Sequence, residues 1–201
     1  MTVHVIYETH AISTDNETGI ATGWLPGRLS DTGRRLARDL GARRRDSAIA
    51  AVFTSDLTRA VETAQIAFEG SSILIFQDSR LRECNYGDLK GAPVAEVAAV
   101  RRRYIAEPFP NGQSYRDVVN QTRDFLDDLA RDWTDRTLLI IAHSANRWAL
   151  EYLLNGIPLE DLVDAPFNWQ EGWHYELPVL EDPHPLPPRP RTGEGETTML
   201  S

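Results

Sequence analysis

Four short runs of apolar residues, rich in β-branched side chains, stand out along the chain. They cover residues 3–7, 48–55, 72–76 and 137–144. Their apolar residues are nearly continuous, without the regular apolar–polar alternation of a strand with one wet face. Such runs are typical of strands buried on both faces, as in a parallel sheet. The pattern therefore predicts four buried strands, the first of which starts close to Met1.

Apolar residues at helical spacing fill the segments between these runs. The predicted helices cover residues 31–45, 55–68, 92–105, 114–133 and 143–156. Ser55 or Asp56 is expected to cap the second helix and Ser114 the fourth, while Gly156 ends the last. Strands that alternate with helices predict an α/β fold, a three-layer sandwich in which helices flank a mainly parallel central sheet.

The C-terminal segment has a different composition from the rest of the chain. Residues 178–201 contain six of the chain's 12 prolines and show almost no apolar periodicity. Such a segment buries too little apolar surface to offset the entropy of ordering it. We therefore expect one folded domain over residues 1–177 and a Pro-rich tail that is disordered or lies on the surface. The "PLPPRP" stretch could serve as a polyproline ligand, but a plain tail is the simpler interpretation.

Composition narrows the range of functions. Acidic residues outnumber basic ones by 30 to 21, which disfavours a nucleic-acid surface because phosphate backbones attract a basic face. The single cysteine, Cys84, rules out an internal disulfide framework and a Cys-rich metal site. No apolar run approaches the roughly 20 residues of a membrane helix, and no secretory signal is recognisable. We expect a cytoplasmic protein. Anionic small substrates remain open, because a local basic pocket can exist inside an acidic protein, and a homodimer is compatible with the sequence.

Four side chains that can carry chemistry follow predicted strands. His10 and His143 each come directly after a strand, Arg59 lies early in the helix after the second strand, and Glu83 follows the third strand by one loop. The carboxyl ends of parallel strands meet at one rim of a sheet, where ligands bind. His143 also opens a helix, where unpaired backbone N–H groups favour an anion. We therefore expect these four residues to form one site.

Each of these residues also has an ordinary structural explanation. A histidine after a strand is commonly a loop residue, and a helix arginine commonly faces solvent. The predicted helix 31–45 places Leu36 and Leu40 on one face, and its other faces carry arginines that fit a solvated surface. These are Arg34, Arg35, Arg43, Arg44 and Arg45. On spacing and strand position alone, the catalytic interpretation is the weaker of the two.

Several longer motifs change this balance. In chain order they are "THAISTDN" from Thr9, "ATGWLPGRLSDTG" from Ala21, "FTSDLTRAVETA" from Phe53, "RLRECNYGDLKG" from Arg80, "PNGQSYRDV" from Pro110 and "LLIIAHSANRWALEYLL" from Leu138. Their order and content resemble the histidine phosphatase superfamily, in the branch of cofactor-dependent phosphoglycerate mutases and small phosphatases. The resemblance spans about residues 3–177 and implies a phosphoglycerate mutase-like fold.

The resemblance implies phosphoryl transfer through a phosphohistidine. His10 is then the nucleophile and Glu83 the acid and base, while Arg59 and His143 bind phosphoryl oxygens. No metal and no cofactor are implied, and hydrolysis of a small phosphomonoester is the leading function. The chain is shorter than full mutases, so mutase activity is less favoured. Candidate substrate-binding residues are Thr9, Asn16, Thr22, Gly23, Arg28, Tyr86, Ser144 and Trp173.

The chain departs from the family at the nucleophile. Thr9-His10-Ala11 stands where the family has Arg-His-Gly, and Ser144 replaces the glycine after His143. Threonine cannot replace an arginine that grips two phosphoryl oxygens with a charged fork. Three interpretations stay open. Arg28 or Arg147 supplies the missing cation, the scaffold performs acid–base or nucleophilic chemistry on a neutral or differently charged metabolite, or the protein binds a ligand without catalysis.

Two further segments carry alternative interpretations. Trp169, Trp173, His174 and Tyr175 lie where the family has its last strand, and they are either core residues or a pocket wall for a large or aromatic ligand. Residues 101–103 are three arginines that resemble a pair which mutases use to hold the far end of the substrate. A charged helix face is the simpler explanation of these arginines.

Overall fold

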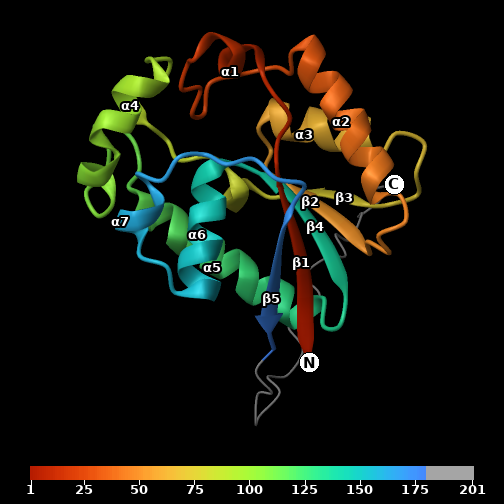
Figure 1. Cartoon of the computed structure of the whole chain (residues 1–201). Coiled ribbons are helices and arrows are strands. Elements are labelled where there is room, and N and C mark those ends of the chain that lie inside the picture. Colours follow the sequence, from red (N-terminus) through yellow and green to blue (C-terminus); the bar gives the residue numbers. More distant parts are fainter. Residues whose placement is uncertain (180–201) are drawn as a thin grey trace, which may run out of the picture.

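A five-stranded sheet in the order β3-β2-β4-β1-β5 forms the centre of the protein (Figure 1). The computed structural model describes residues 1–179. The strands are β1 (Thr2–Thr9), β2 (Ala51–Thr54), β3 (Ile75–Gln77), β4 (Thr137–Ala142) and β5 (Trp173–Pro178). The first four are parallel, whereas β5 runs antiparallel to β1. The predicted α/β class with a mainly parallel sheet is confirmed.

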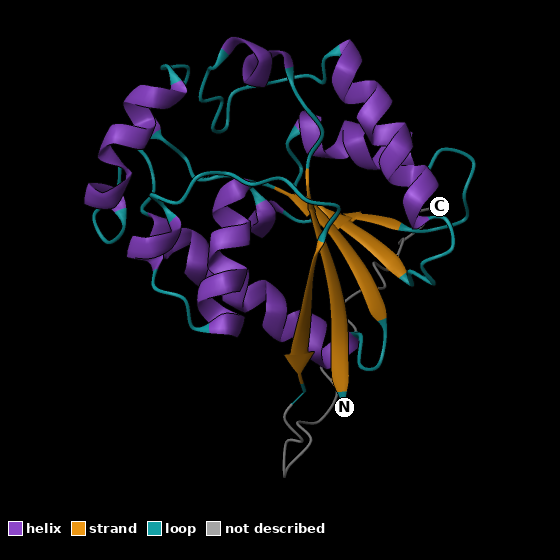
Figure 2. Cartoon of the chain, in the orientation of Figure 1, coloured by secondary structure: helices purple, strands orange, loops and turns teal. Residues whose placement is uncertain are grey.

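Helices cover both faces of this sheet (Figure 2). One face carries α2 (Asp31–Arg44) and α3 (Thr58–Ala67), and the other carries α5 (Tyr115–Asp132) and α6 (Ser144–Asn155). Shorter helices in the connections are α1 (Thr14–Thr18), η1 (Ser79–Leu81), η2 (Gly87–Leu89), α4 (Val94–Val100), η3 (Arg101–Tyr104) and α7 (Leu159–Leu162). The arrangement is the expected three-layer sandwich.

Alternating side chains of the central strands build a separate core on each face. In β1, Val5 and Tyr7 pack with α5 and α6, whereas Ile6 packs with α2 and α3. A third cluster lies between α4, η3, α5, α6 and α7, and it includes Tyr86 and Trp148. This cluster gives the helical side of the molecule a core of its own.

Two helix boundaries were predicted well because their signals are local. Ser114 caps α5 by accepting a hydrogen bond from the Asp117 backbone N–H at 3.1 Å. Gly156 ends α6 in the left-handed conformation, with φ of 69°, which glycine adopts without steric penalty. The caps proposed for the second helix were wrong, because α3 begins at Thr58 after an uncapped Leu57.

The prediction that residues 72–76 form a strand buried on both faces was also wrong. The strand β3 covers only Ile75–Gln77, and its side chains are partly or largely exposed. Among residues 1–179, β3 pairs only with β2, at the end of the strand order, and no further strand of this part of the chain covers its outer edge. Leu74, just before it, is 63% exposed.

The arginines of α2 do not all form a solvated face. Arg44 is buried and donates from Nε and Nη2 to Glu8 Oε1 at 3.0 and 2.7 Å. Arg43 Nη2 donates to the other carboxylate oxygen of Glu8 at 2.9 Å. Leu36, which was expected on the buried face, is 39% exposed. The buried side of α2 is formed instead by small residues beside Leu40, because the helix lies close to its neighbours.

Some predictions fall on the C-terminal segment. The strand β5 extends through Pro178, one residue beyond the expected domain end. The "PLPPRP" stretch lies outside the described residues. Among the residues that the structure describes, no helix combines the length and apolar character needed to cross a membrane.

Candidate active site

His10 and His143 lie side by side because their strands are parallel neighbours. Thr9 at the end of β1 pairs with Ala142 at the end of β4, and the His10 backbone N–H donates to the Ala142 carbonyl at 2.9 Å. The two imidazole rings are 5.0 Å apart between centroids. The structure thus brings together two histidines that the sequence places near opposite ends of the domain.

The hydrogen bonds of His10 show which ring nitrogen carries the proton and which carries the lone pair. Its Nδ1 lies 2.7 Å from the Ala11 carbonyl oxygen, which only accepts, so Nδ1 carries the proton. Its Nε2 accepts a hydrogen bond from Arg59 Nε at 3.2 Å. Burial, and then the charge of Arg59, lower the pKa of His10 to about 3. His10 is therefore neutral near pH 7, with a lone pair on Nε2, as a nucleophile requires.

Arg59 connects the two histidines. It is 2% exposed, in the first turn of α3, and its Nη2 lies 2.9 Å from the Gly23 carbonyl and 3.3 Å from His143 Nδ1. Its Nη1 is buried and has no hydrogen-bond partner among residues 1–179. A buried guanidinium nitrogen with unused N–H groups is costly to maintain without an anion nearby. Arg59 therefore offers donors to an anion beside His10.

His143 is held from several sides. Its Nε2 lies 2.7 Å from Ser55 Oγ, and its backbone carbonyl accepts a hydrogen bond from the Tyr7 hydroxyl at 2.5 Å. Its backbone N–H donates to Asn146 Oδ1 at 3.3 Å. Burial and the positive charge of Arg59 lower the pKa of His143 well below its usual value. The ring is therefore neutral and rigidly placed at the start of α6.

Glu83 lies in the loop after η1 and is 8% exposed. Burial raises the pKa of Glu83, although the Cys84 backbone N–H, 2.8 Å from Oε1, and the charge of Arg59 oppose this shift. Asn146 Nδ2 donates to the Arg82 carbonyl at 3.2 Å, which ties this loop to the first turn of α6. A buried carboxyl with a raised pKa suits a group that gives and takes a proton.

Three of the candidate binding residues make local contacts. The Thr22 hydroxyl donates to Asp15 Oδ2 at 2.8 Å, and Tyr86 packs edge-on against Phe109. Asn16 is exposed in α1, where its side-chain oxygen accepts from the backbone N–H and the hydroxyl of Ser13. No hydrogen bond among residues 1–179 uses its amide nitrogen. Roles of these residues in substrate binding stay predictions.

Neither arginine proposed to replace the missing cation forms a hydrogen bond from its guanidinium to His10 or His143 in the described structure, although the Arg147 backbone N–H donates to the His143 carbonyl at 3.2 Å. Arg28 is exposed, and Arg147 lies over the indole ring of Trp173, 5.1 Å from its centroid. Trp173 itself is buried in β5 against Tyr7, which fits its interpretation as a core residue. Thr9, at the end of β1, forms no side-chain hydrogen bond within residues 1–179. Arg59 is thus the cationic side chain that the described structure places against His10.

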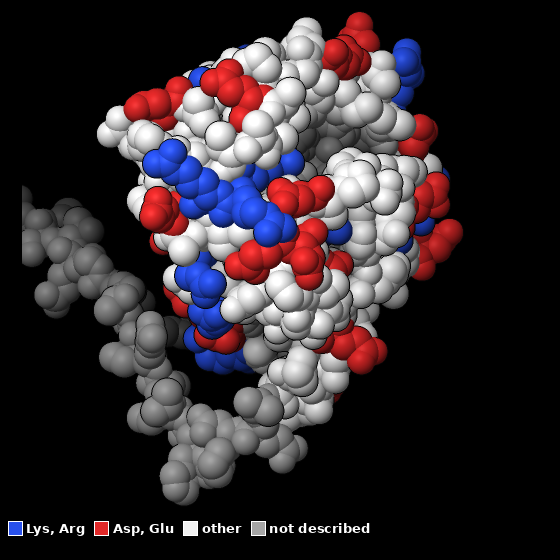
Figure 3. Space-filling model, turned by 60° about the vertical axis from the view of Figure 1, so that its left-hand side comes forward, with Lys and Arg blue, Asp and Glu red and all other residues white. Residues whose placement is uncertain are grey.

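The three arginines of η3 point in different directions. Arg102 is exposed and pairs with Asp164 at 2.8 Å, and Arg103 is exposed. Arg101 turns inward, with its guanidinium 5.3 Å from the Trp148 ring centroid and its Nε buried without a partner in the described structure. Its charge lowers the pKa of Glu83. A band of basic side chains bordered by acidic ones marks this side of the molecule (Figure 3).

Sequence reasoning missed Ser55 and Asp15 as neighbours of the site. Ser55 was considered only as a helix cap, and Asp15 carried no expectation. Their roles depend on contacts with distant residues, which no local pattern reveals. Ser144, by contrast, is the first residue of α6, as the sequence indicated.

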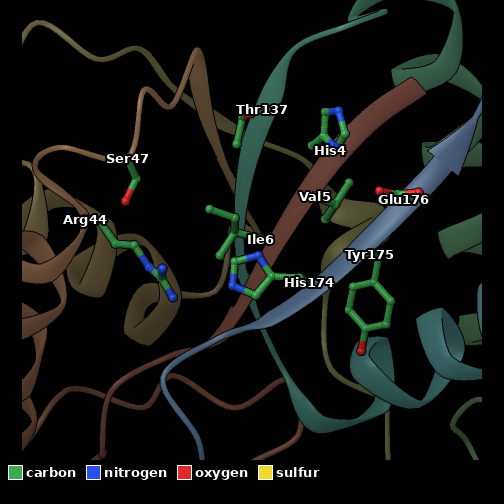
Figure 4. Close-up of a pocket in the computed structure, with 9 residues that line it drawn as sticks. All are labelled: His4, Val5, Ile6, Arg44, Ser47, Thr137, His174, Tyr175 and Glu176. Atoms are coloured by element: carbon green, nitrogen blue, oxygen red, sulfur yellow. The ribbon is translucent and has the colours of Figure 1, made fainter. Parts of the chain in front are cut away.

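A cavity lies away from these residues. It has a volume of about 560 Å³ and is lined on the β1–β5 side by His4, Ile6 and His174 (Figure 4). Arg44 and Ser47 border it from the end of α2. None of the four candidate catalytic residues lines it, so the cavity is distinct from the histidine site.

Comparisons with known proteins agree with this arrangement. The family model described as histidine phosphatase superfamily (branch 1) matches residues 9–170. A 2,3-bisphosphoglycerate-dependent phosphoglycerate mutase of Cytophaga hutchinsonii is 32% identical over 167 residues, covering 77% of this chain and 78% of its own. Phosphoserine phosphatase 1 of Hydrogenobacter thermophilus is 27% identical over 165 residues, 78% of each chain.

Solved structures show the same similarity. Bacillus stearothermophilus YhfR superposes with a TM-score of 0.74 at 26% identity, over 84% of this chain and 88% of its own. A mycobacterial glucosyl-3-phosphoglycerate phosphatase in complex with VO3 gives a TM-score of 0.69 at 25% identity, over 81% and 85% of the two chains. The resemblance inferred from the motifs is confirmed, and the chain belongs to branch 1 of the histidine phosphatase superfamily.

Proposed function

We propose that the protein hydrolyses a small phosphomonoester through a phosphohistidine on His10. The observation that carries the proposal is the fixed orientation of the His10 ring, with Nδ1 on the Ala11 carbonyl and Nε2 toward Arg59. The nucleophilic lone pair and an arginine with unused donors therefore meet at one point. The relatives that are phosphatases and phosphoglycerate mutases support the same class of chemistry.

The reaction follows from this arrangement in two steps. In the first, His10 Nε2 attacks phosphorus, the bond from phosphorus to the ester oxygen breaks, and Glu83 gives its proton to the leaving oxygen. In the second, Glu83 takes a proton from water, the water oxygen attacks phosphorus, and the bond to His10 breaks. Arg59 and the backbone N–H groups at the start of α6 stabilise charge on the phosphoryl oxygens in both steps.

The inward position of Arg101 supports a substrate with a second anionic group. We propose that its guanidinium binds a carboxylate on the leaving group, because its Nε is buried beside Trp148 and has no hydrogen-bond partner among the described residues. Arg101→Met is then expected to raise KM for phosphoserine at least tenfold and to leave KM for an aryl phosphate unchanged. Arg102→Met is the matched control, because Arg102 points away and pairs with Asp164. Equal effects of the two substitutions on phosphoserine contradict this role.

A second candidate function rests on Thr9. With no arginine at this position, Arg59 is the single cation against His10 in the described structure, which suits a substrate of lower charge than a phosphate dianion. On this alternative, the same residues perform acid–base or nucleophilic chemistry on a neutral or differently charged metabolite. A homologue that binds a ligand without turnover is the third possibility that the sequence left open.

An assay with an aryl phosphate separates these functions. The proposed function predicts turnover by the wild-type protein, trapping of an acid-labile phosphoprotein, and loss of both in His10→Ala. His4→Ala serves as the control, because His4 is an exposed histidine of β1 that lines the distant cavity. Turnover that survives in His10→Ala refutes the nucleophile assignment. Absence of turnover with a panel of phosphomonoesters favours the second candidate.

A further inference from the structure

Ser55 contacts the site but has no role in the two proposed reaction steps. It follows β2 directly, is fully buried, and its Oγ lies 2.7 Å from His143 Nε2. The Leu57 backbone N–H also donates to this oxygen, at 3.3 Å. A hydroxyl can donate or accept, so the proton on the His143 ring must be located from its other contact.

The contact with Arg59 shows which nitrogen of the His143 ring carries the proton. A guanidinium only donates hydrogen bonds, and Arg59 Nη2 lies 3.3 Å from His143 Nδ1. Nδ1 is therefore the acceptor, and the proton of the neutral ring is on Nε2, which donates it to Ser55. The histidine thus presents a lone pair, and no N–H, to Arg59.

A phosphoryl group beside His10 requires that His143 donate a hydrogen bond from Nδ1 instead of accepting one. A phosphate dianion offers only acceptors, so Nδ1 can bind one of its oxygens only by carrying a proton itself. Because Ser55 keeps the proton on Nε2, the ring must gain a second proton from solvent and become an imidazolium. The bound anion stabilises this charge, which burial and Arg59 oppose in the ligand-free site.

We propose that Ser55 is a positioning residue that holds the proton on His143 Nε2 and thereby couples binding of a phosphoryl anion to uptake of one proton on Nδ1. This inference rests on the proposed function, because it requires a phosphoryl group between Arg59 and His143. Other groups that face His143 or its turn of α6 are His10 after β1, the Tyr7 hydroxyl of β1, and Glu83 after η1. Arg147 lies on the same helix.

The first measurement locates the proton in the ligand-free protein. Nitrogen-15 spectra of the histidine rings are expected to show His143 protonated on Nε2 in the wild-type protein and a mixture of both neutral forms in Ser55→Ala. Ser55→Thr retains the hydroxyl and is expected to restore the wild-type form. Thr54→Val is the control, because Thr54 is an equally buried hydroxyl that bonds the Ser55 carbonyl and not the ring. A wild-type proton on Nδ1 overturns the proposal.

The second measurement determines how many protons the protein takes up when it binds phosphate. Calorimetric titration with inorganic phosphate at pH 8, in two buffers of different ionisation enthalpy, is expected to give uptake of about one proton per phosphate in the wild-type protein and in Thr54→Val. Ser55→Ala is expected to take up less than half as much, because its neutral ring can carry the proton on Nδ1 instead. Equal uptake by Ser55→Ala and wild-type protein overturns the proposal.

The experiments distinguish failure of the proposed phosphatase function from failure of the proton coupling alone. If the wild-type protein neither binds phosphate nor turns over an aryl phosphate, the coupling is refuted together with the phosphatase assignment. If it binds phosphate without proton uptake while His143 carries its proton on Nε2, the phosphatase assignment survives and only the coupling is refuted.

Discussion

Replacement of Arg44 by methionine is expected to destabilise the fold, because it leaves the Glu8 carboxylate buried with one remaining partner. Arg44 makes two hydrogen bonds to Glu8 Oε1, at 3.0 and 2.7 Å, and a third from Nη2 to the Glu171 carbonyl at 2.8 Å. Glu8 is 1% exposed. The remaining partner, Arg43, reaches the carboxylate through one nitrogen only.

The size of the effect follows from these contacts. Removing one member of a buried ion pair costs about 3–5 kcal/mol, since the other charge stays desolvated. Because Arg43 remains, we expect a loss near the lower end, about 3 kcal/mol in the free energy of unfolding. For a domain of this size, such a loss lowers Tm by about 6–12 °C.

Urea unfolding followed by circular dichroism measures the loss directly. Arg45→Met is the control, because Arg45 is the next residue and is exposed. In the double variant with Glu8→Met, both charges are absent, and we expect most of the stability to return. If Arg44→Met and Arg45→Met have the same free energy of unfolding, the buried pair does not stabilise the protein as argued.

Three further predictions concern the site and the loop that carries it. Thr9→Arg is expected to raise kcat/KM for an aryl phosphate at least tenfold, since a donor to a developing oxyanion is commonly worth about 3 kcal/mol; no gain in an active enzyme means that another cation already does this. Because the pKa of His10 is lowered to about 3 and burial raises that of Glu83, kcat/KM is expected to stay high well below pH 6.5 and to fall as Glu83 loses its proton with rising pH. Glu83→Gln is expected to make this alkaline fall less steep in a pH–rate profile, because only the part that comes from Glu83 is lost, and an unchanged slope contradicts the role of Glu83. Gly33→Ala is expected to lower the free energy of unfolding by about 2 kcal/mol in urea titration, because its Cβ would lie 1.9 Å from the Ile12 carbonyl oxygen; a change below about 0.5 kcal/mol would show that the loop yields without cost.

The pKa of His10 also predicts how stability depends on pH. The folded state holds His10 neutral down to about pH 3, whereas the unfolded chain protonates it below about pH 6.5. The unfolded state therefore binds more protons in this window, and the free energy of unfolding falls as the pH falls through it. His10→Asn is expected to make this fall shallower in urea titrations at pH 7 and pH 4, and an identical fall contradicts the burial of a neutral ring.

The parts of the fold that sequence predicts well depend on local signals. The apolar runs that form β1 and β4 are continuous, and the positions of His10 and His143 follow from where those runs end. Gly156 ends a helix through its own backbone conformation. Such signals need no knowledge of distant residues.

What sequence did not predict depends on partners far along the chain. Arg44 has the same sequence context as Arg45, and only its contact with Glu8 buries it. Glu8 itself carried a usable signal, since a charged residue within an apolar strand needs a partner. Ser55 contacts His143 across 88 positions of sequence, and no spacing rule connects the two. The exposure of β3 follows from its place at the end of the strand order, which the apolar run does not encode.

The strand order has a consequence for the chain during its synthesis. Of the five strands in residues 1–179, β1 leaves the ribosome first, but its two neighbours in the sheet, β4 and β5, are made last. Until β4 emerges, the His10 backbone has no Ala142 carbonyl to bind and the second histidine does not exist. A nascent chain therefore carries the proposed nucleophile early but completes the site around it late. On the proposed function, activity appears only when translation of the domain is nearly complete.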